Sequence, residues 1–326
     1  MNTIDLVDSE LRPLLAIFPT RRLSRANLAE ARQRVLPIPP QPPADVSVRE
    51  AAVAGRGVAP AVPVRIYKPA TDEPLPCIFH MHGGGFVMGS VKDMAAVHTA
   101  MASELRCAIV SVDYRLAPET AFPGNIEDCY AALAWTFANA SAEGFDKARI
   151  GVMGESAGGG LAASLALMAR DRGEFSLAFQ NLIYPMLDDR TCMLTDPHPT
   201  AGEFVWHAHN NHFGWEALLG HPPGLSGTSA YAAAARADDL TGLPPTFIST
   251  GALDLFVDED IDYARRLNRA GVSVELHVYP GAFHGFTLIP DAAVAVAARR
   301  DSLAALQRFT MRRVRSPPQN GERSSI

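Results

Sequence analysis

The sequence predicts an α/β fold whose central sheet is mostly parallel and is covered by helices on both faces. Short, almost continuously apolar runs alternate with longer helix-like segments between residues 77 and 311. Strands that are apolar on both sides are typical of parallel sheets, because both faces of such sheets are buried. The 326 residues, 48% of them hydrophobic, are enough for one large domain of this class with an insertion.

The expected elements follow in chain order. Residues up to about Arg34 are helix-like, and a proline-rich stretch over 37–43 ends this pattern. The alternating segments 46–53 and 62–67 predict a hairpin-like pair of edge strands. Further strands are expected at 77–81, 108–112, 150–153, 178–184, 246–250 and 274–279, and helices at 94–105, 126–138, 203–219, 259–270 and 292–311.

The stretch 150–161 places a serine at the turn between a strand and a helix. Residues 150–153 are apolar, and the residues after Ser156 are small and then rich in Leu, Ala and Met. Gly154 and Gly158 flank the serine where a side chain would collide with the neighbouring strand and helix. The first amides of the helix favour negative charge beside the hydroxyl. This is the nucleophile-elbow pattern, so Ser156 is a candidate nucleophile.

A glycine-rich loop follows the strand 77–81. Consecutive glycines let backbone N–H groups turn toward a ligand without hindrance from Cβ atoms. An oxyanion needs two or three such donors, and we expect them to be the amides of Gly84, Gly85 and Ala157. A flexible loop or a phosphate-binding loop is the alternative, which the absence of a following Lys-Ser/Thr disfavours. The rest of the expected substrate-binding loop consists of His82, Gly83 and Phe86.

The base is expected to be His284. It follows a strand and comes late in the chain, as the order Ser…Asp…His requires. His80 alternates on a strand and is expected to be a packed side chain. No metal site is expected, because the spacing of the three remaining clustered histidines does not bring them onto one helical face; these are His207, His209 and His212.

The acid that orients this histidine should lie in a loop after a strand. Asp254 follows the strand 246–250 and is the expected acid. Asp258 and Asp260 are rivals, but they fall at the start of the next helix, where Asp is common as an N-terminal charge.

Four segments together resemble the hormone-sensitive-lipase-like esterases of the α/β-hydrolase fold: 82–85, 114–119, 154–159 and 284–286. The resemblance covers about residues 45–312. It implies a serine carboxylic ester hydrolase that works through an acyl-enzyme without metal or organic cofactor, and a bracing role for 114–119. Two residues depart from the family pattern: Glu155 stands where Asp is more frequent, and Leu255 follows the acid where Pro is usual.

The resemblance and the composition together predict the domain organisation. We expect an N-terminal arm over 1–45 that contributes to a cap, and a catalytic domain made of 46–184 and 245–315. Residues 185–244 are expected to be a cap insertion, and 316–326 a disordered tail. Apolar residues of the arm and the insertion are expected to pack on each other over Ser156 and close a pocket that limits the acyl chain to short or medium length. They are Leu11, Leu14, Leu15, Ile17, Phe18, Phe204, Val205, Trp206, Phe213, Trp215 and Leu218.

Composition sets the expected partners and compartment. A net charge of −6 gives no reason to expect nucleic acid, and the arginines at 21, 22, 25, 32 and 34 are expected to form a solvated helix face. Four scattered cysteines are expected to be reduced. Without a signal-like or bilayer-spanning segment, a cytoplasmic protein is expected. The expected partner is a small-molecule ester, and a homodimer is an open alternative to a monomer.

Two other functions share this pattern. An amide-cleaving or dehydratase-like enzyme would use the same residues, and a leaving-group screen on matched esters and amides would separate it from an esterase. A non-catalytic ligand receptor, as in the gibberellin receptors, would lack the base, which the presence of His284 disfavours.

Overall fold

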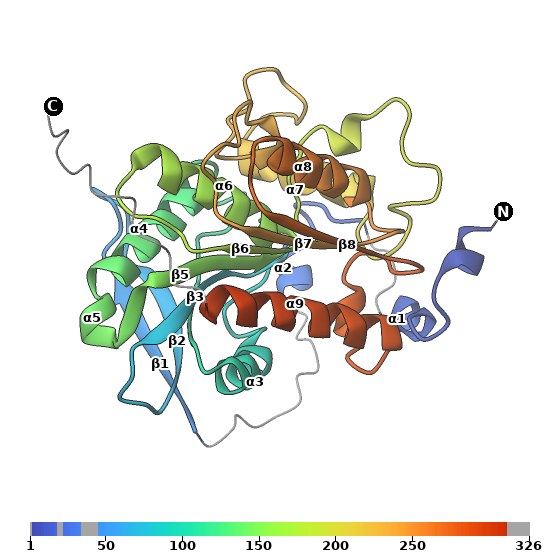
Figure 1. The fold of residues 1–326 in the computed structure, drawn as a ribbon. Helices are drawn as coiled ribbons and strands as arrows, with labels where there is room; N and C mark the ends of the chain where they lie inside the picture. The colour runs from blue at the N-terminus through green and yellow to red at the C-terminus, as the bar shows by residue number, and fades with distance from the viewer. Residues whose placement is uncertain (1, 18–21, 34–44, 312–326) are drawn as a thin grey trace, which may run out of the picture.

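A computed structural model describes residues 2–17, 22–33 and 45–311 (Figure 1). Its sheet has the strand order β1-β2-β4-β3-β5-β6-β7-β8. β1 pairs antiparallel with β2 and β2 antiparallel with β4, whereas the neighbours from β4 to β8 are parallel. The bounds are β1 Val46–Val53, β2 Val62–Pro69, β3 Leu75–Met81, β4 Ala108–Val112, β5 Phe145–Glu155, β6 Gln180–Ile183, β7 Thr246–Gly251 and β8 Val274–Tyr279. The predicted mostly parallel sheet is thus confirmed.

Helices cover both faces of this sheet (Figure 1). α3 and α9 lie on one face, and α4, α6 and α8 lie on the other. The central strands β3 and β4 are buried along their whole length, which explains their continuous apolar runs. The helix bounds are α1 Arg12–Ile17, α2 Leu28–Arg32, α3 Ala95–Leu105, α4 Gly124–Ala138, α5 Ala140–Glu143, α6 Ala157–Arg172, α7 Ala208–Leu219, α8 Val257–Arg269 and α9 Ala293–Met311.

The N-terminal arm differs from the predicted run of helix. Its described part consists of a short 3₁₀ turn, Thr3–Leu6, and the short helices α1 and α2. The pieces are anchored in different cores: Leu11 and Leu14 pack with the α3 and α9 side, whereas Leu28 packs with the other. A single straight helix could not reach both. The predicted tail 316–326 and Phe18 lie outside the described residues, and the proposed domain boundaries stay a prediction.

The insertion also differs in one element. The helix expected over 203–219 begins only at Ala208, as α7. The preceding residues bend, because Val205 has a positive φ of 59°, which a helix does not accommodate. Similarly, the strand expected over 178–184 is shortened to β6, and Tyr184 has a φ of 35°. Both bends lie at the end of the sheet where the site is built. None of the helices in the described ranges has the length and apolarity to span a bilayer.

Candidate active site

The turn that carries Ser156, the predicted nucleophile, joins β5 to α6. Ser156 has φ 56° and ψ −122°, a conformation that non-glycine residues adopt rarely and that is typical of functional turns. A Cβ on Gly154 would lie 2.2 Å from the carbonyl oxygen of Gly158, and one on Gly158 would lie 2.1 Å from that of Met81. Strand and helix therefore approach so closely that only glycine fits at both positions, as the sequence predicts.

The predicted triad residues meet in one hydrogen-bonded chain. Ser156 Oγ lies 2.9 Å from His284 Nε2, and His284 Nδ1 lies 2.8 Å from Asp254 Oδ2. The other carboxylate oxygen, Oδ1, accepts a hydrogen bond of 3.0 Å from the backbone N–H of Phe256. Asp254 is fully buried, and Ser156 is 7% exposed. This arrangement places a proton acceptor on the serine hydroxyl and a fixed carboxylate behind it.

The rival acids do not take part in this chain. Asp258 is exposed on the first turn of α8, and Asp260 is buried but has no hydrogen bond to His284 among the described residues. Desolvation raises the pKa of Asp260 well above its usual range, and the charges of Glu259 and Asp254 raise it further. Asp260 is therefore a buried carboxyl group with a raised pKa, close enough to Asp254 to be affected by its charge.

Aromatic rings hold the imidazole in place. The ring of Phe256 meets that of His284 edge-on at 5.0 Å between centroids, and the ring of Tyr184 does so at 4.9 Å. The Tyr184 hydroxyl is itself fixed by Thr287 at 2.7 Å. These contacts leave the histidine ring little freedom to turn away from the serine.

The glycine-rich loop presents its backbone to the same point. Gly84 and Gly85 have φ values of 120° and 60°, which favour glycine. Over residues 45–311, the N–H groups of Gly84, Gly85 and Ala157 have no acceptor within the protein. Ala157 is also the first residue of α6, where the helix dipole is positive. The three predicted donors are thus available to an external oxygen.

The other predicted loop residues support this backbone. His82 is 2% exposed and stacks on Tyr114 at 4.3 Å, and the Tyr114 hydroxyl donates to the His82 carbonyl at 2.7 Å. Desolvation lowers the pKa of His82, so the ring is neutral and its Nδ1–H donates to the carbonyl of Gly83 at 2.8 Å. Phe86 is 1% exposed and packs on Trp215. Substrate binding by this loop stays a prediction for its backbone, since the side chains of His82 and Phe86 are packed in its interior.

The departure at Glu155 is explained by His80. This histidine is buried, as predicted, but it is also paired: Nδ1 lies 3.0 Å from Ser111 Oγ, and Nε2 lies 2.8 Å from Glu155 Oε2. The longer side chain of Glu155 reaches from β5 to the imidazole on β3. Glu155, the residue before Ser156, is therefore held by a buried partner that the spacing of residues in the sequence did not reveal.

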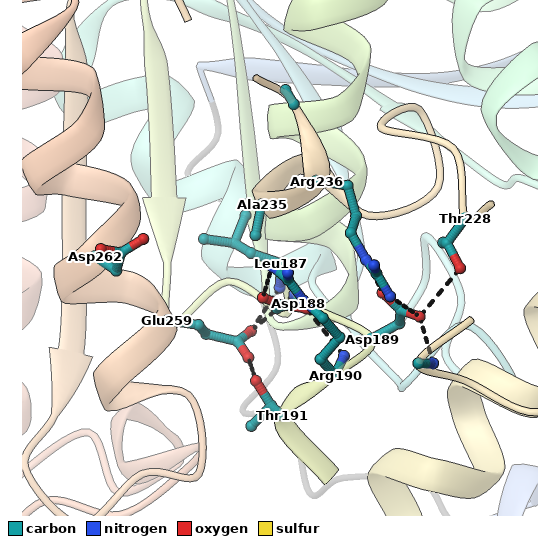
Figure 2. A network of polar contacts seen from close by, with 12 residues as sticks. Leu187, Asp188, Asp189, Arg190, Thr191, Thr228, Ala235, Arg236, Glu259 and Asp262 are labelled. Atoms are coloured by element: carbon teal, nitrogen blue, oxygen red, sulfur yellow. Dashed lines mark hydrogen bonds and ion pairs between the residues drawn. The ribbon is translucent and has the colours of Figure 1, made fainter. Parts of the chain in front are cut away.

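Glu259, on α8, is a buried carboxylate that the sequence did not single out (Figure 2). One of its oxygens accepts the N–H groups of Leu187 at 2.7 Å and Asp188 at 3.3 Å, and the other accepts the hydroxyl of Thr191. The adjacent Met186 N–H donates to the Ser156 carbonyl at 2.9 Å. Glu259 thus links α8, the helix that follows Asp254, to the segment that supports Ser156. Its position in the first turn of α8 hides this role in the sequence.

Asp189 ties this first part of the insertion to its later residues (Figure 2). Its carboxylate binds the Arg236 guanidinium in two contacts, of 2.7 and 2.9 Å, and accepts the N–H of Gly224 at 2.7 Å. Desolvation opposes the charge, but these bonds outweigh it and lower the pKa of Asp189. The charged pair fixes the route of the chain below the site.

The prediction of a solvated arginine face was wrong at Arg32. Its guanidinium donates to the carbonyls of Val87 at 2.7 Å and Ala117 at 2.9 Å, and both of its terminal nitrogens bind Glu119 at 2.7 Å. This pairing lowers the pKa of Glu119 to about 2. Arg32 therefore ties the arm to the glycine-rich loop and to the segment 114–119, and only tertiary packing brings these together. Arg22 and Arg25 are exposed, whereas the arginines at 21 and 34 lie outside the described residues.

Known proteins are similar to this chain in sequence and in fold. Residues 78–288 match the family described as alpha/beta hydrolase fold. The chain is 35% identical to carboxylesterase NlhH of Mycobacterium tuberculosis (strain ATCC 25618 / H37Rv), covering 93% of this chain and 96% of the relative. It is 34% identical to esterase LipI of the same strain, covering 87% and 90%.

Two solved esterase structures are similar to this chain in fold. A bacterial heroin esterase superposes with a TM-score of 0.86 at 40% identity, over 95% of this chain and 99% of the other. Esterase LipW from Mycobacterium marinum gives a TM-score of 0.81 at 32% identity, over 95% and 98%.

Proposed function

This chain belongs to the α/β-hydrolase family and is a carboxylic ester hydrolase, and we propose that Ser156, His284 and Asp254 are its catalytic triad. The observation that carries the proposal is the buried hydrogen-bond chain from Ser156 Oγ through the imidazole to the Asp254 carboxylate. We further propose that the chain falls among the hormone-sensitive-lipase-like esterases, on the segments quoted for that resemblance.

The proposed reaction follows from this geometry. His284 Nε2 takes the proton of Ser156 as the oxygen attacks the ester carbonyl, and Asp254 stabilises the resulting imidazolium. The developing oxyanion binds the N–H groups of Gly84, Gly85 and Ala157, each such donor being worth about 3 kcal/mol of transition-state stabilisation. His284 then protonates the leaving alcohol, and water repeats the cycle on the acyl-enzyme.

We propose short to medium acyl chains as substrates. The arm and the insertion meet above the sheet: the N–H of Leu23 donates to Asn210 Oδ1 at 2.8 Å, and His209 Nε2 lies 3.1 Å from the Leu23 carbonyl. Only 7% of the Ser156 surface is exposed, which supports a confined site. The expected packing of the arm on the insertion is met only in part. Leu11 and Leu14 lie in the core that contains Phe283, beside His284, whereas Trp215 and Leu218 lie in the core on the opposite side of the sheet.

The proposal extends to partner and compartment. A small-molecule ester is the expected partner. The net charge of −6 does not favour binding to a polyanion such as nucleic acid. All four cysteines are free, and three of them are buried, which supports a reducing compartment such as the cytoplasm.

Covalent labelling tests the nucleophile. A fluorophosphonate should form one adduct, on Ser156, as read by peptide mass spectrometry, and Ser156→Ala should lower kcat by at least about 10⁴-fold with the fold retained. Ser164→Ala is the matched control. Ser164 lies on α6, the helix that begins after Ser156, and is also buried, but it bonds to the carbonyl of Ala230 and not to the triad. An adduct elsewhere, or an active Ser156→Ala variant, would contradict the assignment.

A further inference from the structure

A short segment of the insertion crosses the loops that carry the triad. We call residues 202–206 the strap. The N–H of Gly202 donates to the Leu253 carbonyl at 3.0 Å, beside the acid. A Cβ on Gly202 would lie 2.6 Å from Leu255 Cδ1, so the residue that departs from the family pattern packs directly on the strap. The strap is thus pinned to the loop of Asp254.

The centre of the strap is a strained turn. Val205 has φ 59°, and the N–H of Trp206 donates across it to the carbonyl of Phe204 at 2.7 Å. A three-residue turn of this hand is rare, and a β-branched residue at positive φ is an outlier. Such conformations persist where surrounding contacts determine them, and they gather at functional sites. The strained turn at Val205 sets the position of the next residue in the chain.

That residue is Trp206. A Cβ on Gly85 would lie 2.2 Å from Trp206 Cη2, so the edge of the indole rests on the backbone of the glycine-rich loop. The indole and the imidazole of His284 lie 6.3 Å apart between centroids. The other end of the indole is fixed, because Nε1 donates to Asn211 Oδ1 at 3.2 Å. The ring therefore stands between the proposed oxyanion donors and the proposed base.

We propose that Trp206 is a specificity-determining residue that limits the size of the alcohol part of the ester. The inference rests on the proposed triad. An ester attacked by Ser156 has its carbonyl oxygen at the amides of Gly84 and Gly85, and its leaving oxygen must face His284 Nε2 to receive the proton. The substituent on that oxygen then lies on the side of the imidazole, where the indole forms the wall.

A second tryptophan of the insertion provides the contrast. Trp215 is fully buried and packs on Phe86 at 5.0 Å between centroids, beneath the loop. It has the same chemistry and belongs to the same insertion, but it faces the core. A change there should alter stability without selecting among esters.

The test uses the full chain and two ester series. One varies the alcohol at constant acetate, from ethyl to cyclohexyl acetate, and the other varies the acyl group at constant ethanol, from acetate to octanoate. In Trp206→Ala, kcat/KM for cyclohexyl acetate relative to ethyl acetate should rise at least tenfold, and in Trp206→Phe it should rise less. The acyl ratio should change less than threefold, and Trp215→Phe should leave both ratios unchanged.

The possible results distinguish a wrong role for Trp206 from a wrong triad. An unchanged alcohol ratio in both Trp206 variants would overturn the inference, as would an acyl ratio that moves as far as the alcohol ratio. Fluorophosphonate titration counts the active sites, so a loss of folded enzyme does not imitate a change in selectivity, and Trp206→Phe keeps the test valid if Trp206→Ala misfolds. If the unmodified protein carries no adduct on Ser156, the proposed triad fails instead.

Discussion

The carboxyl edge of the sheet and the cap above it are held in different ways. At the edge, Ser156, Asp254 and His284 each lie within a few residues of the end of β5, β7 or β8. Because these strands belong to one sheet, their ends place the three side chains together. In the cap, residues far apart in sequence meet through single side chains, as Arg32 meets Val87 and Trp206 meets Gly85.

The difference predicts two kinds of response to substitution. A change at the edge removes an atom that takes part in the proposed reaction, so its effect on kcat should be large and nearly complete. A change in the cap moves a wall or a brace, so its effect should be graded and should depend on the substrate. The following variants test this contrast.

The largest effect is expected at the acid. Asp254→Asn should lower kcat about 10³- to 10⁴-fold, because the amide no longer holds the correct imidazole tautomer or stabilises its cation. Asp258→Asn is the matched control on the same stretch, and its exposed side chain should cost less than about twofold. Steady-state kinetics on one ester measures both. Equal losses of kcat in the two variants would mean that the hydrogen bond between Asp254 and His284 is not required for catalysis.

An intermediate effect is expected at the brace between arm and loop. Arg32→Ala removes donors to two backbone carbonyls of the loop region, and half-buried charged hydrogen bonds of this kind are worth about 1–2 kcal/mol together after screening. We expect that loss in the free energy of unfolding and a kcat reduced about threefold to tenfold. Arg25→Ala, on an exposed arginine of the same arm, should change neither. A fully inactive but folded Arg32→Ala variant would erase the distinction between edge and cap.

The smallest effect is expected at Asp260, the buried carboxyl group whose pKa is raised. The pKa of Asp260 is raised in the folded state, so the folded chain keeps a proton that the unfolded chain has lost, and stability falls as pH rises above the unfolded value of about 4. Asp260→Asn removes this penalty. Urea unfolding should show about 1 kcal/mol of added stability at pH 8 and no gain below pH 4, with activity retained.

Asp258→Asn again serves as the control, because its exposed carboxylate should give no such pH dependence. A gain at Asp260 that is the same at pH 4 and pH 8 would show that packing, and not ionisation, is the cause.

The sequence by itself determined the sheet, most of the helices that cover it, and the residues of the proposed triad at its carboxyl edge. Apolar runs fixed the buried strands, and Gly154 and Gly158 marked a turn that no other residue type fits. Asp254 and His284 could be chosen because the end of a strand in a parallel sheet is a defined place, so local patterns suffice to locate residues that are distant in the chain.

Only the tertiary structure decided the cap and the supports of the site. Arg32 and Glu259 have no local signal, since an arginine or glutamate in a first or last helical turn is ordinary. The sequence predicts Trp206 among the apolar residues of the cap, but not its contact with Gly85 or the positive φ of Val205. Their roles arise from contacts across long sequence separations. Such contacts depend on how complete elements pack, and that packing is not encoded in the spacing of neighbouring residues.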